Sequence, residues 1–197
     1  MDKNIKLFIG LGNPDKQYQK TRHNFGDIVL NEIVASISVK FKINNNKKVS
    51  YATYYHNGSI DKRVFLIKPL VPMNLSGIPI ASFMRDHKIN PEEIFVFYDD
   101  FSILLGKYKI KMSGSSAGHH GLESLINCLK TCNFARMKLG IGPIKNSINT
   151  SEFVLSHFYP CDKEKINYIK KTCVILFNMI NIMGVSKAAS TLANIKI

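Results

Sequence analysis

Short apolar runs alternate along this chain with stretches in which apolar side chains recur at helical spacing. The run at residues 5–11 ends at Gly12-Asn13-Pro14, and residues 25–39 then repeat apolar side chains every three or four positions. Further strands are expected at 50–56, 63–67, 94–98, 107–112 and 137–141, and further helices at 78–87, 122–129 and after Asp162, which could cap the last of them. Strands interleaved with helices predict an α/β fold, in which a twisted mixed β-sheet is flanked by helices.

Length and charge narrow the class of protein further. A chain of 197 residues suits a single domain, which we place over 1–197, and it can bury enough surface to fold without a disulfide or a metal. Lysine and arginine total 27 against 14 acidic residues, for a formal net charge of +13. Such an excess indicates a polyanionic partner, with nucleic acid as the first candidate and a merely solubilising surface as the alternative.

Several features favour an intracellular location and argue against a metal site. No window approaches the roughly 20 consecutive apolar residues of a membrane span, and residues 1–6 lack the apolar core of a signal peptide. We therefore expect a cytoplasmic protein with no membrane partner, in which the four cysteines are free thiols. Cys128 and Cys132 lie close together without two further ligands nearby, so no metal site is expected.

The segment 10–15 begins like a dinucleotide-binding fingerprint. Its sixth position is Asp15 rather than glycine or alanine, and Pro14 has no backbone N–H to offer to a pyrophosphate. We therefore expect no nucleotide cofactor.

The segment 114–118 matches the G-x-S-x-G nucleophile elbow and follows a predicted strand. In such an elbow the helix begins at the nucleophile, here Ser116, whereas this chain places a glycine and two histidines before its next helical segment. The acid and base would have to be Glu152 and His157, which are only five residues apart. A serine esterase that uses Ser116 is thus a remote alternative, and a flexible loop is the ordinary explanation.

Three polar side chains each have an ordinary structural explanation when taken alone. His23 lies at the edge of a predicted helix, Asn74 lies in a predicted turn, and Asp99 ends a predicted strand, where carboxylates often cap loops. Strand ends in α/β sheets are also where ligand sites gather. Their order along the chain and their neighbours carry more information than any one of them.

The chain resembles the bacterial-type peptidyl-tRNA hydrolases from about residue 5 to its C-terminal helix. The likeness rests on these segments, in this order: Gly10-Leu11-Gly12-Asn13-Pro14, Tyr18, Thr21-Arg22-His23-Asn24, Met73-Asn74-Leu75-Ser76-Gly77, Asp99, Gly118-His119-His120-Gly121 and Gly140-Ile141-Gly142. The resemblance implies a single catalytic α/β domain that acts as a monomer without metal or cofactor. The family reaction is hydrolysis of the ester that joins a peptide, or an N-blocked aminoacyl group, to the 3′-terminal ribose of tRNA, which recycles tRNA released prematurely from ribosomes.

The resemblance also implies a role for each catalytic side chain. His23 matches the general base that activates water, and Asp99 matches the carboxylate that holds its imidazole. Asn74 matches the residue that positions water or the scissile carbonyl and helps to stabilise the oxyanion. Asn13 matches the residue that distinguishes blocked from free aminoacyl groups.

Other positions match the family's contacts with its substrate. They are Tyr18, Pro72, Met73, Asn74, His120, Lys109, Lys111, Arg136 and Lys138. The cationic side chains are expected to meet tRNA phosphates without regard to sequence. Four positions depart from the family pattern: Pro72 replaces a common aromatic residue, His120 replaces an asparagine, Ser102 stands where a second aspartate is common, and Lys138 stands where arginine is usual.

A tRNA-binding relative that has lost or altered hydrolysis is the second hypothesis. A pure binder has no need to retain His23, Asn13, Asn74 and Asp99 together, and all four are present here. The sequence therefore favours an active enzyme whose substrate is peptidyl-tRNA.

Overall fold

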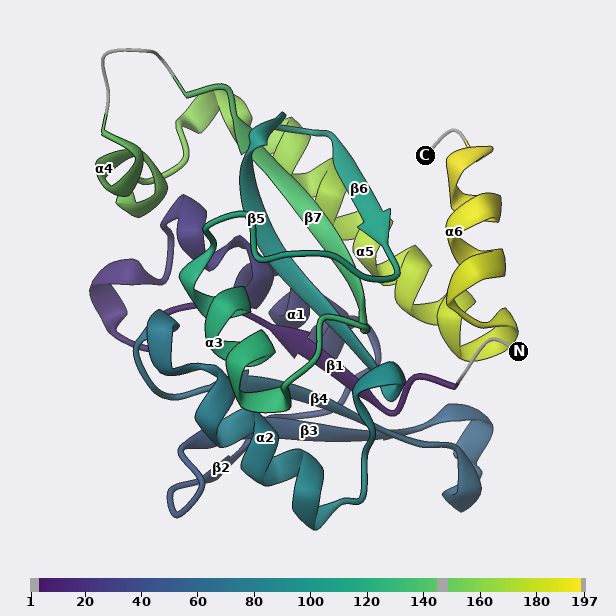
Figure 1. The fold of residues 1–197 in the computed structure, drawn as a ribbon. Helices are drawn as coiled ribbons and strands as arrows, with labels where there is room; N and C mark the ends of the chain where they lie inside the picture. The colour runs from purple at the N-terminus through teal and green to yellow at the C-terminus, as the bar shows by residue number, and fades with distance from the viewer. Residues whose placement is uncertain (1–3, 145–148, 196–197) are drawn as a thin grey trace.

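The computed structural model describes residues 4–144 and 149–195, and within them seven strands form one mixed sheet (Figure 1). The strands are β1 (Leu7–Gly10), β2 (Lys42–Asn44), β3 (Val49–Tyr55), β4 (Arg63–Pro69), β5 (Ile94–Leu104), β6 (Tyr108–Lys111) and β7 (Ala135–Gly142). Their order across the sheet is β2-β3-β4-β1-β5-β7-β6. The inner strands β4, β1, β5 and β7 run parallel, whereas β3 and β6 are antiparallel to their inner neighbours.

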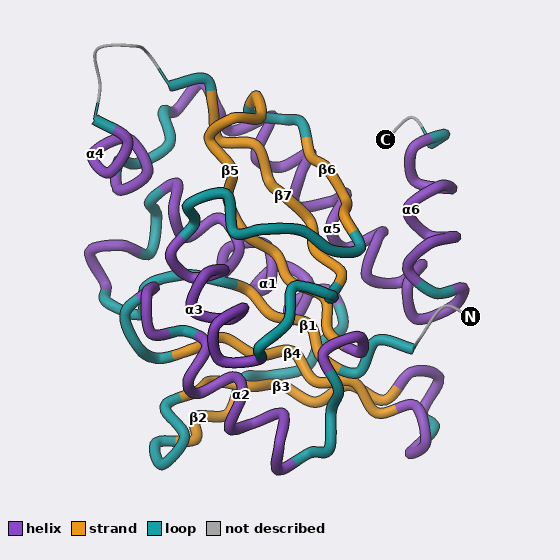
Figure 2. The backbone as a smooth tube through the Cα atoms, in the orientation of Figure 1, coloured by secondary structure: helices purple, strands orange, loops and turns teal. Residues whose placement is uncertain are grey.

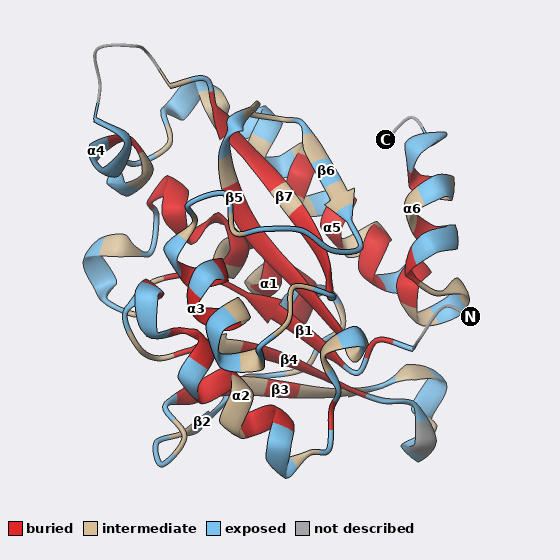
Figure 3. Cartoon of the chain, in the orientation of Figure 1, coloured by how far each residue is buried: buried red, intermediate tan, exposed pale blue. Residues whose placement is uncertain are grey.

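Helices cover both faces of this sheet (Figures 1 and 2). They are α1 (Phe25–Ser36), α2 (Gly77–Asp86), α3 (His120–Leu129), α4 (Thr150–Leu155), α5 (Lys163–Met183) and α6 (Val185–Ala193). Phe8 packs in one core with α1 and α5, and its ring centroid lies 4.8 Å from that of Phe177. Leu7 and Ile9 belong to the opposite core, with α2 and α3. β1 is therefore buried along its whole length (Figure 3), with alternate side chains in the two cores.

The predicted α/β class is confirmed, and the boundaries differ where the chain is polar. β5 continues to Leu104, beyond the predicted end at 98, because it pairs with β7 as far as Gly142. β2, α4 and α6 were not predicted, because short polar elements have weak periodicity. The Asp162 side chain does not cap α5, since it accepts a hydrogen bond from the backbone N–H of Tyr159 instead.

The structure bears on the expected absence of a membrane-spanning helix, but not on the expected absence of a signal peptide. In the described part of the chain, no helix has the length and apolar character needed to cross a bilayer. Residues 1–3 begin the segment in which no signal peptide was expected, and they lie outside the described residues.

The parallel strands bring the predicted polar side chains to one edge of the sheet. Asn13 follows β1, the turn that contains Met73 and Asn74 follows β4, and Asp99 lies within β5. In open α/β sheets, ligand sites form beyond the carboxyl ends of the parallel strands. The turn before α1 adds His23 at the same place, so the fold gathers these side chains around one point.

Candidate active site

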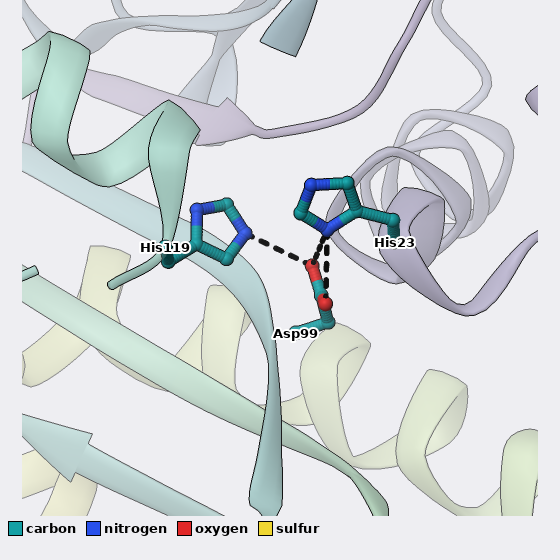
Figure 4. A group of neighbouring side chains, drawn as sticks. All are labelled: His23, Asp99 and His119. Carbon is teal, nitrogen blue, oxygen red and sulfur yellow. Dashed lines mark hydrogen bonds and ion pairs between the residues drawn. The ribbon is translucent and has the colours of Figure 1, made fainter. Parts of the chain in front are cut away.

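His23 and Asp99 form a buried hydrogen-bonded pair at the centre of the site (Figure 4). His23 lies in the 3-10 turn Arg22–Asn24, which leads directly into α1. Its Nδ1 atom is 3.0 Å from Oδ1 and 3.1 Å from Oδ2 of Asp99. An ionised carboxylate only accepts, so Nδ1 carries the proton and Nε2 is left as the basic nitrogen.

His119 shares the same carboxylate from the opposite side. Its Nε2 atom lies 3.0 Å from Oδ1 of Asp99, and its Nδ1 atom accepts the backbone N–H of Leu122 at 3.2 Å, as the N-cap of α3. Because Nδ1 accepts, the proton of neutral His119 is on Nε2 and is donated to Asp99. The sequence showed His119 within a resembling motif but gave it no role. Its position immediately before a helix is the signal that could have identified it as a cap.

The charges at the centre follow from this arrangement. Burial would raise the pKa of Asp99, but the two histidines lower it to about 2, so this carboxylate stays ionised. Burial would lower the pKa of His23, but the charge of Asp99 and the hydrogen bond to it raise the value above its usual range. The three ring and carboxylate ligand atoms lie within 4.8 Å of one another, a donor set that a transition metal could accept. Hydrogen bonds from the two imidazole N–H groups already explain why both histidines contact Asp99.

Asn13 and Asn24 connect the end of β1 to the turn that carries His23. The backbone N–H of Asn13 donates to Oδ1 of Asn24 at 2.9 Å, and Nδ2 of Asn24 donates to the backbone oxygen of Asn13 at 2.8 Å. The Oδ1 atom of Asn13 in turn accepts the backbone N–H of Met73 at 2.8 Å. The Asn13 amide therefore has its Nδ2 group left to donate beside His23, while Asn74 is exposed next to Met73.

Two cavities in the described part of the chain meet at His23. The larger, about 350 Å³, is lined by Asn13, Pro72, Met73, Asn74, Leu155 and the side chains shared with the second cavity. The smaller, about 170 Å³, is lined by Asp99, His119 and residues 116–118. The shared lining side chains are His23, His120, Ser151 and Val154. A substrate can therefore extend to either side of the proposed base.

Most of the side chains predicted to meet tRNA lie at the rim of this site or on the neighbouring sheet edge. Lys109 and Lys111 are exposed on β6, and Lys109 is paired in register with Lys138 on β7. Lys138 forms an ion pair with Asp100, with an Nζ to Oδ2 distance of 2.7 Å. Tyr18 is half-buried in the 3-10 turn Lys16–Tyr18 and is not among the side chains that line either cavity.

Arg136 is the exception, because its side chain is enclosed by the protein and does not reach the surface at which a tRNA phosphate would be met. Its side chain is among the most deeply buried, at 1% exposure. Its guanidinium donates to the backbone oxygens of Gly114 at 2.7 Å and Cys132 at 2.6 Å. Strand alternation places Arg136 on the same face as Lys138, but the loop after β6 covers it.

The geometry around Ser116 does not support the serine-esterase alternative. The α3 helix begins at His120, four residues after Ser116, and Oγ of Ser116 accepts the backbone N–H of Gly118 at 3.4 Å. Neither Glu152 nor His157 is among the residues that line the cavity that Ser116 shares with His23. The arrangement needed to activate Ser116 is therefore not formed by the residues that the sequence offered.

Comparisons with known proteins point to one family. The family model described as "Peptidyl-tRNA hydrolase" matches residues 7–197. The chain is 38% identical over 170 residues to the peptidyl-tRNA hydrolase of Aquifex aeolicus, covering 86% of each chain. It is 35% identical over 187 residues to that of Methylacidiphilum infernorum, covering 95% of this chain and 97% of the relative. The crystal structure of the enzyme from Acinetobacter baumannii superimposes with a TM-score of 0.89 at 24% identity, over 98% of this chain and 96% of that one.

Proposed function

The chain belongs to the peptidyl-tRNA hydrolase family and hydrolyses the ester bond of peptidyl-tRNA, and we propose that His23 is the general base of this reaction. The observation that carries the proposal is the orientation of its ring. Nδ1 is held by both oxygens of Asp99, which leaves Nε2 basic at the junction of two cavities. A histidine poised near neutral pH and oriented by a carboxylate is suited to take a proton from water.

In the proposed reaction, Nε2 of His23 removes a proton from a water molecule as its oxygen bonds to the ester carbonyl carbon. The carbonyl oxygen becomes negatively charged, and the side-chain amides of Asn74 and Asn13 are the donors available on that side of His23. The bond from carbon to the ribose oxygen then breaks, and His23 returns its proton to that oxygen. The products are a tRNA with a free terminal hydroxyl and a peptide with a free carboxyl group, which then ionises by releasing its proton to water.

Asp99 and His119 act behind the base in this proposal. Asp99 fixes the tautomer of His23 and stabilises the imidazolium that forms, without taking the proton itself, because its pKa is about 2. His119 donates a second hydrogen bond to Asp99, which keeps the carboxylate oriented and ionised. The base therefore depends on a chain of three side chains.

The partner surface is proposed from charge. Lys109, Lys111 and Lys138 would contact phosphates near the acceptor end of tRNA, with Tyr18 as a further contact on the other side of the site. The whole chain would act as one catalytic domain, as a monomer, in the cytoplasm where peptidyl-tRNA arises.

Hydrolysis of an N-acetyl-aminoacyl-tRNA by the purified protein tests the proposed base. His23→Ala is expected to lower kcat by about 10²- to 10⁴-fold, the range of general-base catalysis, while tRNA binding is largely retained. Ser116→Ala is the control and is expected to stay close to wild type. Near-normal hydrolysis by His23→Ala would remove His23 from the mechanism, and a collapse in Ser116→Ala would restore the esterase alternative.

A further inference from the structure

All three guanidinium nitrogens of Arg136 form hydrogen bonds within the protein. Nη1 donates to the backbone oxygen of Gly114 at 2.7 Å and lies 3.5 Å from that of Ser115. Nη2 donates to the oxygen of Cys132 at 2.6 Å, and Nε donates to that of Phe134 at 3.3 Å. The guanidinium carbon also lies 4.1 Å from the ring centroid of Phe134. Burying a charged group costs folding free energy, and hydrogen bonds to that group offset the cost. Here the acceptors are four backbone oxygens.

The backbone oxygens of Gly114 and Ser115 belong to the loop that connects β6 to α3. This loop crosses in front of β5 and β7 on its way to α3 (Figure 1). Its backbone has positive φ angles of 141° at Gly114, 49° at Ala117 and 80° at Gly118. Ala117 is the one residue of the three that carries a Cβ atom. A positive φ angle is unfavourable for it and must be maintained by surrounding contacts. Arg136 supplies contacts of that kind from β7.

The same loop ends at His119, whose ring donates to Asp99 from the start of α3. Residues 116–118 of the loop also line the smaller cavity beside His23. The position of this wall therefore depends on where the loop is anchored. A displacement of the loop would move His119 relative to Asp99 without touching His23 directly.

We propose that Arg136 is a positioning residue for hydrolysis: it anchors the 113–118 loop so that His119 reaches Asp99 and Asp99 holds the base. This inference rests on the proposed role of His23. It assigns the positive charge of Arg136 to the interior of the protein and not to tRNA.

The neighbouring cation on the same strand provides the contrast. Lys138 lies two residues farther along β7, on the same face, and pairs with Lys109 in register, whereas Arg136 pairs with Lys111. Lys138 ends near the surface beside Asp100, and Arg136 ends beneath the loop. A phosphate contact and a loop anchor should differ in their response to salt, because only the first releases counterions from tRNA.

The test compares Arg136→Lys and Arg136→Met with Lys138→Met, using hydrolysis of an N-acetyl-aminoacyl-tRNA at several salt concentrations. For both Arg136 variants we expect kcat to fall by about 10- to 100-fold, as for a catalytic group displaced by about 1 Å. The salt dependence of KM should match that of wild type. For Lys138→Met, KM should rise and its salt slope should decrease by about 0.7–0.9.

Arg136→Lys keeps the positive charge and has one donor nitrogen in place of three, so it remains informative where Arg136→Met does not fold. In Arg136→Lys, the ring ¹⁵N signals of His119 should lose the wild-type pattern of a protonated Nε2 and an acceptor Nδ1. A flattened salt slope with normal kcat in Arg136→Lys would make Arg136 a phosphate contact and overturn the proposal. A lower melting temperature with normal kcat and normal His119 signals would make its role structural only, and would also overturn it. If His23→Ala remained active, the proposed base would fail instead, whatever the Arg136 variants did.

Discussion

The two sides of the catalytic cleft are held in place by different kinds of contact. On one side, which we call the amide side, the backbone N–H of Met73 donates to Oδ1 of Asn13, and the backbone N–H of Asn13 donates to Oδ1 of Asn24. On the other side, which we call the loop side, residues 114–120 are held by Arg136, which donates to the backbone oxygen of Gly114, and by His119, which donates to Asp99. The contacts of the amide side lie beside the ends of β1 and β4. The contacts of the loop side are a few hydrogen bonds that join the loop to β5 and β7.

Packing differs between the two sides as well. A Cβ atom added at Gly26, behind the amide side, would lie 2.3 Å from the backbone oxygen of Phe97 and 2.7 Å from that of Leu11. A Cβ atom added at Gly118, on the loop side, would have no neighbour within 4 Å. The amide side should therefore be sensitive to volume, and the loop side to the loss of particular hydrogen bonds.

Asp99 lies where the two sides meet, and replacing it should have the largest effect. In Asp99→Asn the negative charge is lost, and the NH₂ group that replaces Oδ2 faces Nδ1 of His23 and favours the wrong tautomer of that ring. We expect kcat to fall by about 10²- to 10⁴-fold. Steady-state hydrolysis of an N-acetyl-aminoacyl-tRNA measures this.

The pH dependence of Asp99→Asn has a definite sign. Burial lowers the pKa of His23, and the charge of Asp99 raises it. Without that charge, burial dominates, so the acid limb of kcat/KM should move to lower pH. The control is His119→Asn, which can still cap α3 and leaves Asp99 charged, so its acid limb should not move down. An acid limb that stays in place or rises in Asp99→Asn would contradict the proposed pair.

Matched glycine substitutions test the packing difference directly. Gly26→Ala forces a side chain against backbone that cannot move aside, and we expect a loss of at least about 1–3 kcal/mol in the free energy of unfolding. In Gly118→Ala the new methyl group has open space around it, so the loss is only the cost of the left-handed backbone conformation, about 1–2 kcal/mol in the free energy of unfolding. Urea unfolding of both variants gives the comparison. A larger loss in Gly118→Ala than in Gly26→Ala would reverse the assignment of the closely packed side.

The amide side was the part that the sequence could predict. Strand runs and turn residues place Asn13 after β1 and Asn74 after β4, where the carboxyl ends of parallel strands converge. These signals are local, because each motif lies within a few residues of the strand that positions it. The same is true of the α/β fold, which follows from the periodicity of apolar side chains.

The loop side was not predicted, because its contacts connect distant parts of the chain. Alternation along β7 places Arg136 and Lys138 on one face, and nothing in their spacing shows that a loop will cover only the first. The role of His119 likewise depends on a carboxylate 20 residues earlier in the chain. Buried polar groups are identified by their partners, and those become visible only once the strands are assembled.

The lysine side chains that lie beyond the loop side should have a smaller, graded effect. Neutralising Lys109, Lys111 and Lys138 together to Gln should raise KM for different tRNAs and reduce the salt slope by about 0.7–0.9 per lost contact. Burial lowers the pKa of Lys138, but its hydrogen bond to Asp100 raises it overall, so Lys138 is charged in wild type. KM measured against salt concentration gives the slope.

The control for the lysine variants removes one lysine charge from the other face of the sheet, so the salt slopes are compared per charge removed. Lys170 lies in α5 and pairs with Glu32, so Lys170→Gln should leave the salt slope unchanged. An unchanged slope in the triple variant would place the tRNA on another surface. An equal decrease in Lys170→Gln would mean that net charge, not position, determines the response.

His120 completes the loop side, and replacing it should have the smallest effect. Its side chain is 72% exposed, lines both cavities, and has Nδ1 3.7 Å from Oε2 of Glu123. Protonated His120 adds a positive charge near His23, which opposes protonation of the base, while Asp99 favours it. We therefore expect a second ionisation in the acid limb of kcat/KM, weakened by solvent because His120 is exposed. Measured between about pH 5 and 8, His120→Asn should remain active with a simpler acid limb. Superimposable acid limbs for wild type and His120→Asn would show that this exposed ring has no part in the titration, and that the loop side acts on the base through His119 alone.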